Sequence, residues 1–111
     1  MPFGFPAYAE RTERLKGHSA KALLRAAEDA LETLGWHPRR EDRCTLRASV
    51  PMGMHGIFVT FGARFRVEIE DDTCFIRSEG NFPLEWMDLG QHAENIRRFL
   101  DRVEDILEED D

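Results

Sequence analysis

The stretch RFRVEIEDDTCFIRS, residues 64–78, decides the fold of this chain. Apolar and polar residues alternate on both sides of the Asp-Asp pair at 71–72, which is typical of two half-buried strands joined by a two-residue turn. That turn places apolar side chains opposite one another on one face and Arg66 opposite Arg77 on the other. The sequence therefore predicts a β-hairpin with one apolar face and one charged face.

The residues before the hairpin continue the alternation. Residues 44–50 alternate strictly, and every odd position from 57 to 69 is apolar. An unbroken strand over 57–69 is longer than usual, so we expect a bend or bulge near Gly62. With a third strand over 73–79, the sequence predicts a three-strand antiparallel meander.

Two amphipathic helices flank these strands. Residues 19–34 repeat apolar side chains at helical spacing, with Ser19 as an N-cap and Gly35 placed to end the helix. A second helix is expected to begin at Asp88, and its apolar face runs into the acidic C-terminus. Because each helix has one apolar face, both should cover the same face of the sheet.

A weaker alternation in residues 7–17 is compatible with a first strand, which gives the element order β-α-β-β-β-α. We therefore expect an α+β fold, an antiparallel meander sheet with two helices packed on one face, in a single domain over residues 1–111. The acidic end at 108–111 is expected to be disordered, because acidic side chains at a helix C-terminus oppose the helix dipole.

The charge is unevenly distributed along the chain. The net charge is −7, and the last eight residues hold six acidic side chains and no basic one. The rest of the chain is nearly neutral, which argues against binding of duplex nucleic acid without excluding a local basic patch. No apolar run is long enough for a transmembrane segment, and the N-terminus lacks the features of a secretory signal. We expect a cytoplasmic protein whose two cysteines, Cys44 and Cys74, are thiols in the core.

Four arginines are expected on the open face of the sheet. Arg66 and Arg77 face each other there, and Arg64 faces Glu79, with further glutamates diagonal to the like-charged pair. Two interpretations remain open. The face is either a solvated charged surface whose ion pairs offset the repulsion, or a basic strip for a phosphate, an anionic head group or an acidic segment such as the protein's own C-terminus. The strip comprises Arg47, Arg64, Arg66 and Arg77.

A second candidate surface lies at one end of the sheet. A meander brings the connections 51–56 and 80–87 to the same end, and both are rich in methionine and aromatic residues. They form either a small satellite core or a contact patch for a protein partner. The candidate partner-binding residues are Met52, Met54, Ile57, Phe58, Phe82, Leu84, Trp86 and Met87.

Catalytic and metal-binding patterns are not recognisable. The four histidines are scattered, and no C-x-x-C, G-x-S-x-G or phosphate-binding glycine loop occurs. We therefore expect no enzyme activity, no metal and no cofactor. His92 is expected to face solvent, and Asn95 to hydrogen-bond the 80–87 connection from a buried or half-buried position.

Three short motifs carry a family resemblance: ALETLGW, FGARFRVEIE and MDLGQHAENIRRFL. They resemble a small bacterial α+β domain family of no established activity, whose last helix opens with the pattern D.G.N..NI..F. The matching positions are Leu34, Gly35, Trp36, Phe61, Gly62, Asp88, Gly90, Asn95, Ile96 and Phe99, while His92 stands where the pattern has Asn.

Together these patterns favour a small cytoplasmic binding or adaptor module that contacts a protein partner or an anionic surface. The alternative is a dimer similar to secretion chaperones, which would hold an extended partner segment along a strand edge. That alternative rests on size, acidity and element order.

Overall fold

The structure is a computed structural model that describes residues 8–51, 53–55, 58–60, 62–80 and 91–109. The described residues form two helices, a five-stranded sheet and a separate two-stranded hairpin. In chain order, the elements are β1 (Tyr8–Arg14), α1 (Ala20–Thr33), β2 (Arg39–Arg40), β3 (Thr45–Val50), β4 (Gly53–His55), β5 (Phe58–Thr60), β6 (Ala63–Glu70), β7 (Thr73–Gly80) and α2 (Gln91–Glu109).

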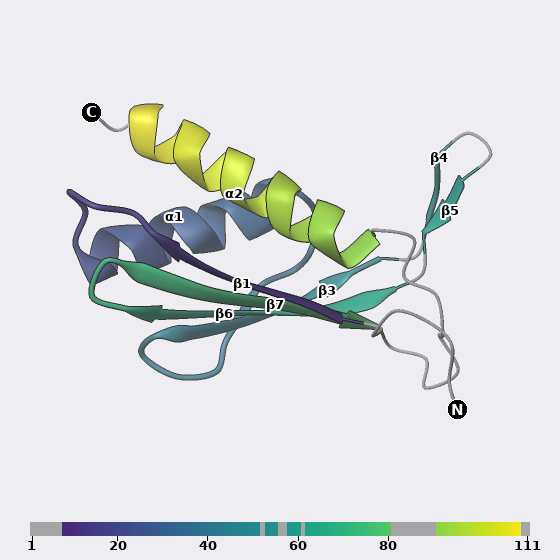
Figure 1. The fold of residues 1–111 in the computed structure, drawn as a ribbon, viewed down its shortest axis with the longest axis horizontal. Coiled ribbons are helices and arrows are strands. Elements are labelled where there is room, and N and C mark those ends of the chain that lie inside the picture. The colour runs from purple at the N-terminus through teal and green to yellow at the C-terminus, as the bar shows by residue number, and fades with distance from the viewer. Residues whose placement is uncertain (1–7, 52, 56–57, 61, 81–90, 110–111) are drawn as a thin grey trace.

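The predicted α+β fold is confirmed. The main sheet has the strand order β1-β7-β6-β3-β2, and every neighbouring pair is antiparallel. Strands β3, β6 and β7 form the expected meander, while β1 returns from the N-terminus to pair with the outer side of β7. Both helices lie on one face of the sheet, as Figure 1 shows. The opposite face has no helix on it among the described residues.

The hairpin formed by β6 and β7 has the predicted register. Glu70 pairs with Thr73 around the turn, and Arg66 pairs with Arg77 further along. Asp71 has a φ of 54°, a left-handed value that Asp tolerates better than most residues. Successive side chains of a strand point to opposite faces of the sheet. This one register therefore determines which residues of β6 and β7 face the core and which lie on the open face.

The long apolar alternation from 57 to 69 is interrupted where a bend was expected. Regular pairing with the meander begins at Ala63, and the chain before it forms β5, which pairs with β4. The hairpin β4–β5 was not predicted, because Pro51 and two glycines suggested only a break in the strand. Alternation alone does not reveal which neighbour a strand will pair with.

The core lies between the sheet and the two helices. Phe65 of β6 is 1% exposed and packs between Trp36 and Phe99, with ring centroids 5.1 Å and 5.2 Å away. It therefore joins the end of α1, the centre of the sheet and the middle of α2. Val67 and Ile69, the next apolar residues of the same strand, are also buried.

Helix α1 ends as its sequence predicts. Ser19 caps the N-terminus, where its hydroxyl accepts a hydrogen bond from the amide of Ala22 at 3.1 Å. At the other end Gly35 has a φ of 79°, and the amide of Trp36 donates to the carbonyl of Leu31 at 3.0 Å. This Schellman-type end turns the chain so that Trp36 enters the core and the following residues pass to the sheet edge.

Helix α2 differs from the expectation in two ways, and its predicted first residue, Asp88, lies outside the described residues. His92 is fully buried rather than solvent-facing, and the helix continues to Glu109, into the segment expected to be disordered. His92 lies on the side of α2 that faces the sheet. Strand β7 passes beneath this residue, and the hydroxyl of Ser78 in β7 gives the imidazole a buried polar partner.

Only one of the two cysteines belongs to the core. Cys74 is 1% exposed, whereas Cys44 is half-buried and precedes β3. The amide of Cys44 donates to Oδ1 of Asp42 at 2.9 Å, so this residue belongs to the turn that leads into the strand. The expectation that both thiols lie in the core was therefore wrong for Cys44.

Candidate anion-binding face

The open face of the sheet carries a row of arginines that crosses four strands. Arg39 of β2 pairs with Arg47 of β3, Arg47 pairs with Arg66 of β6, and Arg66 pairs with Arg77 of β7. Cross-strand partners lie on the same face, so these four side chains stand side by side. Glu10 of β1 pairs with Arg77 and ends the row. We call the four residues the arginine row.

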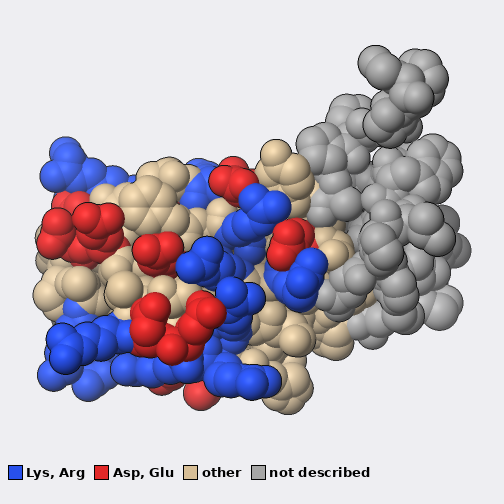
Figure 2. Space-filling view, turned by 90° about the horizontal axis from the view of Figure 1, so that it is seen from below, with Lys and Arg blue, Asp and Glu red and all other residues tan. Residues whose placement is uncertain are grey.

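A hollow of about 530 Å³ lies over this row. Figure 2 shows basic side chains gathered across the middle of this face with acidic ones between them. The charged side chains that line the hollow are five arginines and two glutamates, which leaves a surplus of positive charge in a chain whose net charge is −7. They are Arg39, Arg47, Arg64, Arg66 and Arg77, with Glu41 and Glu79.

The connection from α1 to β2 positions Arg39, the member of the arginine row that lies on β2. His37 has a φ of 50°, and it follows a tryptophan that is buried in the core. The chain thereby crosses from the helix-covered face to the sheet edge, where Arg39 joins the row and Arg40 turns back to an ion pair with Glu28 of α1 at 3.0 Å. Sequence reasoning missed Arg39, because a two-residue strand has no periodicity to detect.

Two glutamates inside the hollow each bridge two arginines. A carboxylate oxygen of Glu41 lies 2.9 Å from Nε of Arg47 and 4.0 Å from Nε of Arg66. Glu79 lies 3.4 Å from Arg64 and 3.3 Å from Arg77. The contact with Glu41 raises the pKa of the Arg47 guanidinium, through its hydrogen bond first and its charge second. Glu41 therefore lies between two members of the like-charged row, and Glu79 links Arg77 of the row to Arg64 beside it.

The predicted ion pairs were partly right. Arg64 contacts the glutamate directly opposite, as expected. The remaining carboxylates were expected on diagonal positions, but Arg66 contacts Glu68 of its own strand at 3.8 Å, and Arg77 contacts Glu10 of β1. The carboxylate of Glu10 comes from a strand whose pairing the sequence left undefined.

The turn that carries Glu41 is well ordered by hydrogen bonds. The amide of Glu41 donates to the carbonyl of Thr45 at 2.9 Å, and Asp42 accepts from the amide of Cys44. That backbone hydrogen bond is the main reason that the pKa of Asp42 lies below its ordinary value. The backbone position of Glu41 is thus fixed, while its side chain is 41% exposed at the rim of the hollow.

Two exposed aromatic residues flank the row. Tyr8 is 42% exposed and Phe75 is 40% exposed, the largest exposures of big apolar side chains in the described residues. The guanidinium carbon of Arg77 lies 4.3 Å from the centre of the Tyr8 ring, a cation–π contact. Phe75 lines a smaller hollow of about 230 Å³ that shares Arg66 and Arg77 with the first.

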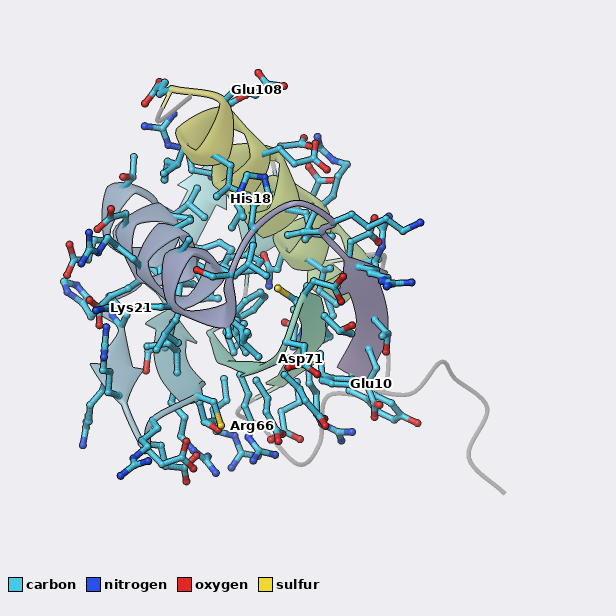
Figure 3. All side chains as sticks on the ribbon, turned by 90° about the vertical axis from the view of Figure 1, so that its left-hand side faces the viewer. Glu10, His18, Lys21, Arg66, Asp71 and Glu108 are labelled. Carbon is cyan, nitrogen blue, oxygen red and sulfur yellow. The ribbon has the colours of Figure 1, made fainter. Side chains whose placement is uncertain are left out.

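The C-terminal acidic segment does not lie on this face. Its described part, residues 104–109, belongs to α2, and Ile106 and Leu107 are buried among core residues on the opposite side of the sheet. Figure 3 shows Glu108 at one side of the molecule and Arg66 at the other. While α2 is packed on the sheet, residues 104–109 cannot occupy the arginine hollow.

Most residues of the apolar patch predicted at the sheet end lie outside the described residues. Met52, Ile57, Phe82, Leu84, Trp86 and Met87 lie outside the described residues, and for Met54 and Phe58 the structure describes only the backbone of β4 and β5. The geometric premise is confirmed, because Val50, Ala63 and Gly80 pair side by side where the two connections begin or end.

A cluster of buried polar side chains lies on the other face of the sheet. Ser78 Oγ is 2.8 Å from His92 Nδ1, and Nδ2 of Asn95 donates to Ser78 Oγ at 3.3 Å. All three side chains are at most 5% exposed. Asn95 is therefore buried as expected, and it donates to Ser78 of β7, whereas residues 81–87 of the connection predicted to be its partner lie outside the described residues. The cluster ties the start of α2 to the sheet beneath it.

Together these elements define the class to which the chain belongs, a two-layer α+β domain with one helix-covered face and one open, arginine-bearing face. No protein-family model matches the chain, and no curated protein or solved structure shows significant similarity to it. Neither α1 nor α2 is long and apolar enough to cross a membrane. Within the described ranges, no three His, Cys, Asp or Glu side chains are grouped as ligands for one metal ion.

Proposed function

We propose that this protein is a non-enzymatic binding module whose open sheet face takes an anionic partner. The arginine row is the observation that carries this proposal. Like charges directly opposite each other across strands are unfavourable, and here three consecutive strand pairs repeat that arrangement. A ligand that brings negative charge to the row would relieve this repulsion.

The chemistry of the side chains supports the same conclusion. Each guanidinium presents a planar fork of donors that matches a carboxylate or phosphate in a bidentate manner. The ion pairs in place leave these arginines about half exposed, so their remaining donors face water. Exposed ion pairs contribute only about 0–1 kcal/mol each, so a ligand can replace them at low cost.

The proposed setting is the cytoplasm, where the thiols of Cys44 and Cys74 would stay reduced. Duplex nucleic acid is not the proposed ligand, because the net charge of −7 opposes the approach of a long polyanion. A protein partner or another compact anionic surface fits the limited extent of the hollow.

The test compares two triple variants of equal charge change. One variant replaces Arg47, Arg66 and Arg77 by Gln, and the control replaces the three arginines of α2, Arg97, Arg98 and Arg102, by Gln. Retention on a carboxylated resin and binding to fluorescent polyglutamate are measured at two salt concentrations. We expect the first variant alone to lose salt-sensitive binding. Equal loss in both variants would mean that only overall charge matters, and it would refute the proposal.

A second candidate function has one observation in its favour. Strand β1, residues Tyr8–Arg14, is at the end of the sheet order, so its outer edge has no strand partner among the described residues. Such an edge can accept an extended segment or a second copy of the chain, as in the chaperone-like alternative. A stable dimer in analytical ultracentrifugation that is abolished by Thr12→Pro would favour this function over the first.

A further inference from the structure

We infer that the partner of the arginine row is an acidic, extended segment of another protein, and that Glu41 occupies the place of one of its carboxylates. This inference rests on the proposed function, since it names the ligand class of the same face. It adds a specific role for one residue of the chain, a resident competitor inside the hollow.

The first argument is the geometry around Glu41. Its carboxylate lies between two arginines on neighbouring strands, 2.9 Å from Arg47 and 4.0 Å from Arg66. The hollow therefore already holds a carboxylate between two members of the row. A carboxylate of a bound peptide at this position would meet the same two guanidinium groups.

The second argument is that the glutamates in the hollow neutralise only part of the positive charge of its arginines. Five arginines line the hollow against two glutamates, and among the described residues no carboxylate lies within ion-pair distance of Arg39. Strands are spaced about 4.8 Å apart, so the row from Arg39 to Arg77 extends about 14 Å, the length of about four extended residues. A segment of that length with alternating acidic side chains presents two carboxylates to the row.

The third argument favours a protein over other anions. Tyr8 and Phe75 are exposed beside Arg66 and Arg77, and arginine with aromatic residues is the composition enriched at protein interfaces. A nucleic acid strand or a lipid bilayer presents a long, dense array of negative charges, whereas the chain as a whole has a net charge of −7 and its hollow holds only five arginines. A short acidic segment brings only a few negative charges, which matches the limited excess of positive charge over the hollow.

The mobility required of Glu41 is limited to its side chain. Its amide donates a hydrogen bond to the carbonyl of Thr45, but its side chain is 41% exposed and the two arginine side chains it contacts are about half exposed. An incoming carboxylate can therefore displace it without unfolding the turn. Because an exposed pair is worth up to about 1 kcal/mol, removing the competing charge should tighten peptide binding by up to about fivefold.

The experiment uses fluorescence anisotropy with the full chain and a labelled peptide of alternating Glu and Ser. A peptide of alternating Gln and Ser, an oligothymidylate and phosphatidylserine vesicles are the comparison ligands. The variants are Glu41→Gln, the double variant Arg47→Gln with Arg66→Gln, and Glu94→Gln as the matched control. Glu94 pairs with Arg97 on α2 and has the same chemistry on the other side of the molecule. Circular dichroism and thermal melting verify that each variant is folded.

We expect the Glu-Ser peptide to bind in a salt-sensitive way, two- to fivefold more tightly to Glu41→Gln, and at least tenfold more weakly to the double arginine variant. Glu94→Gln should bind like the unmodified chain. If the peptide binds but Glu41→Gln does not tighten it, or Glu94→Gln tightens it equally, the role of Glu41 is refuted. If oligothymidylate or vesicles bind more tightly through the same arginines, the partner class is refuted while the proposed function stands. If no anion responds to the double arginine variant, the proposed function itself fails.

Discussion

Replacing Phe65 by Ala tests whether the two helices and the sheet share one core. The side chain of Phe65 is 1% exposed and contacts the rings of Trp36 and Phe99. Truncation of a buried Phe typically costs about 3–5 kcal/mol, through lost burial and the cavity that remains. The upper part of this range is expected here, because two aromatic contacts are lost together.

The matched control is Phe75→Ala. Phe75 is on the neighbouring strand but on the open face, and 40% of its surface is exposed. Its replacement should cost less than about 1 kcal/mol, in line with substitutions at exposed positions. The two variants remove the same atoms, so the difference between them measures which face of the sheet the helices cover.

The assay is urea unfolding followed by circular dichroism, with thermal melting as a second measure. For a domain of this size, about 1 kcal/mol corresponds to about 4 °C, so Phe65→Ala should melt about 12–20 °C lower. Since domains of this kind are stabilised by only about 5–15 kcal/mol, the variant should be close to its folding limit. Equal loss in the two variants, or a loss below about 1 kcal/mol for Phe65→Ala, would refute the two-layer arrangement.

Three further predictions concern stability. Ser78→Ala should lower the free energy of unfolding in urea by about 2–3 kcal/mol, because it removes a hydroxyl that contacts both His92 and Asn95 in the core. A loss below about 0.5 kcal/mol, which is typical of a surface substitution, would contradict that role. Ser19→Ala should cost about 1 kcal/mol by removing the N-cap of α1, with Ser19→Asp as the conservative control that retains it. Burial raises the pKa of the Cys74 thiol from 9.0 to about 11 in the folded protein. As pH rises, the thiol of the unfolded chain therefore loses its proton at a lower pH than the thiol of the folded protein. The free energy of unfolding should therefore fall as pH rises from about 9 to 11, by up to about 1.4 kcal/mol per pH unit, and Cys74→Val should remove that part of the slope; parallel pH profiles for the two proteins would contradict the assignment.

The outcome at individual residues shows where sequence reasoning stops. The pair Arg66 and Arg77 was predictable because both belong to one hairpin, whose turn sets the register. The ion pair between Arg77 and Glu10 was not, since the two residues are 67 positions apart along the chain and β1 also packs against α2. His92 was misplaced for a related reason. A polar residue on a helix is expected to face solvent unless a distant element provides a buried partner, as Ser78 does here.

What the sequence determined by itself is local. Alternation with a period of two defined the meander, apolar residues at helical spacing defined α1 and α2, and the turn at 71–72 set the register that separates core from open face. The tertiary structure alone decided which strands lie at the edges, and so brought Arg39 into the row and the carboxylate of Glu41 between two arginines. The physical reason is that the periodicity of a sequence indicates only whether each side chain is buried or exposed to solvent. The partner of a residue on a neighbouring strand or turn is instead determined by packing between segments that are far apart in the chain.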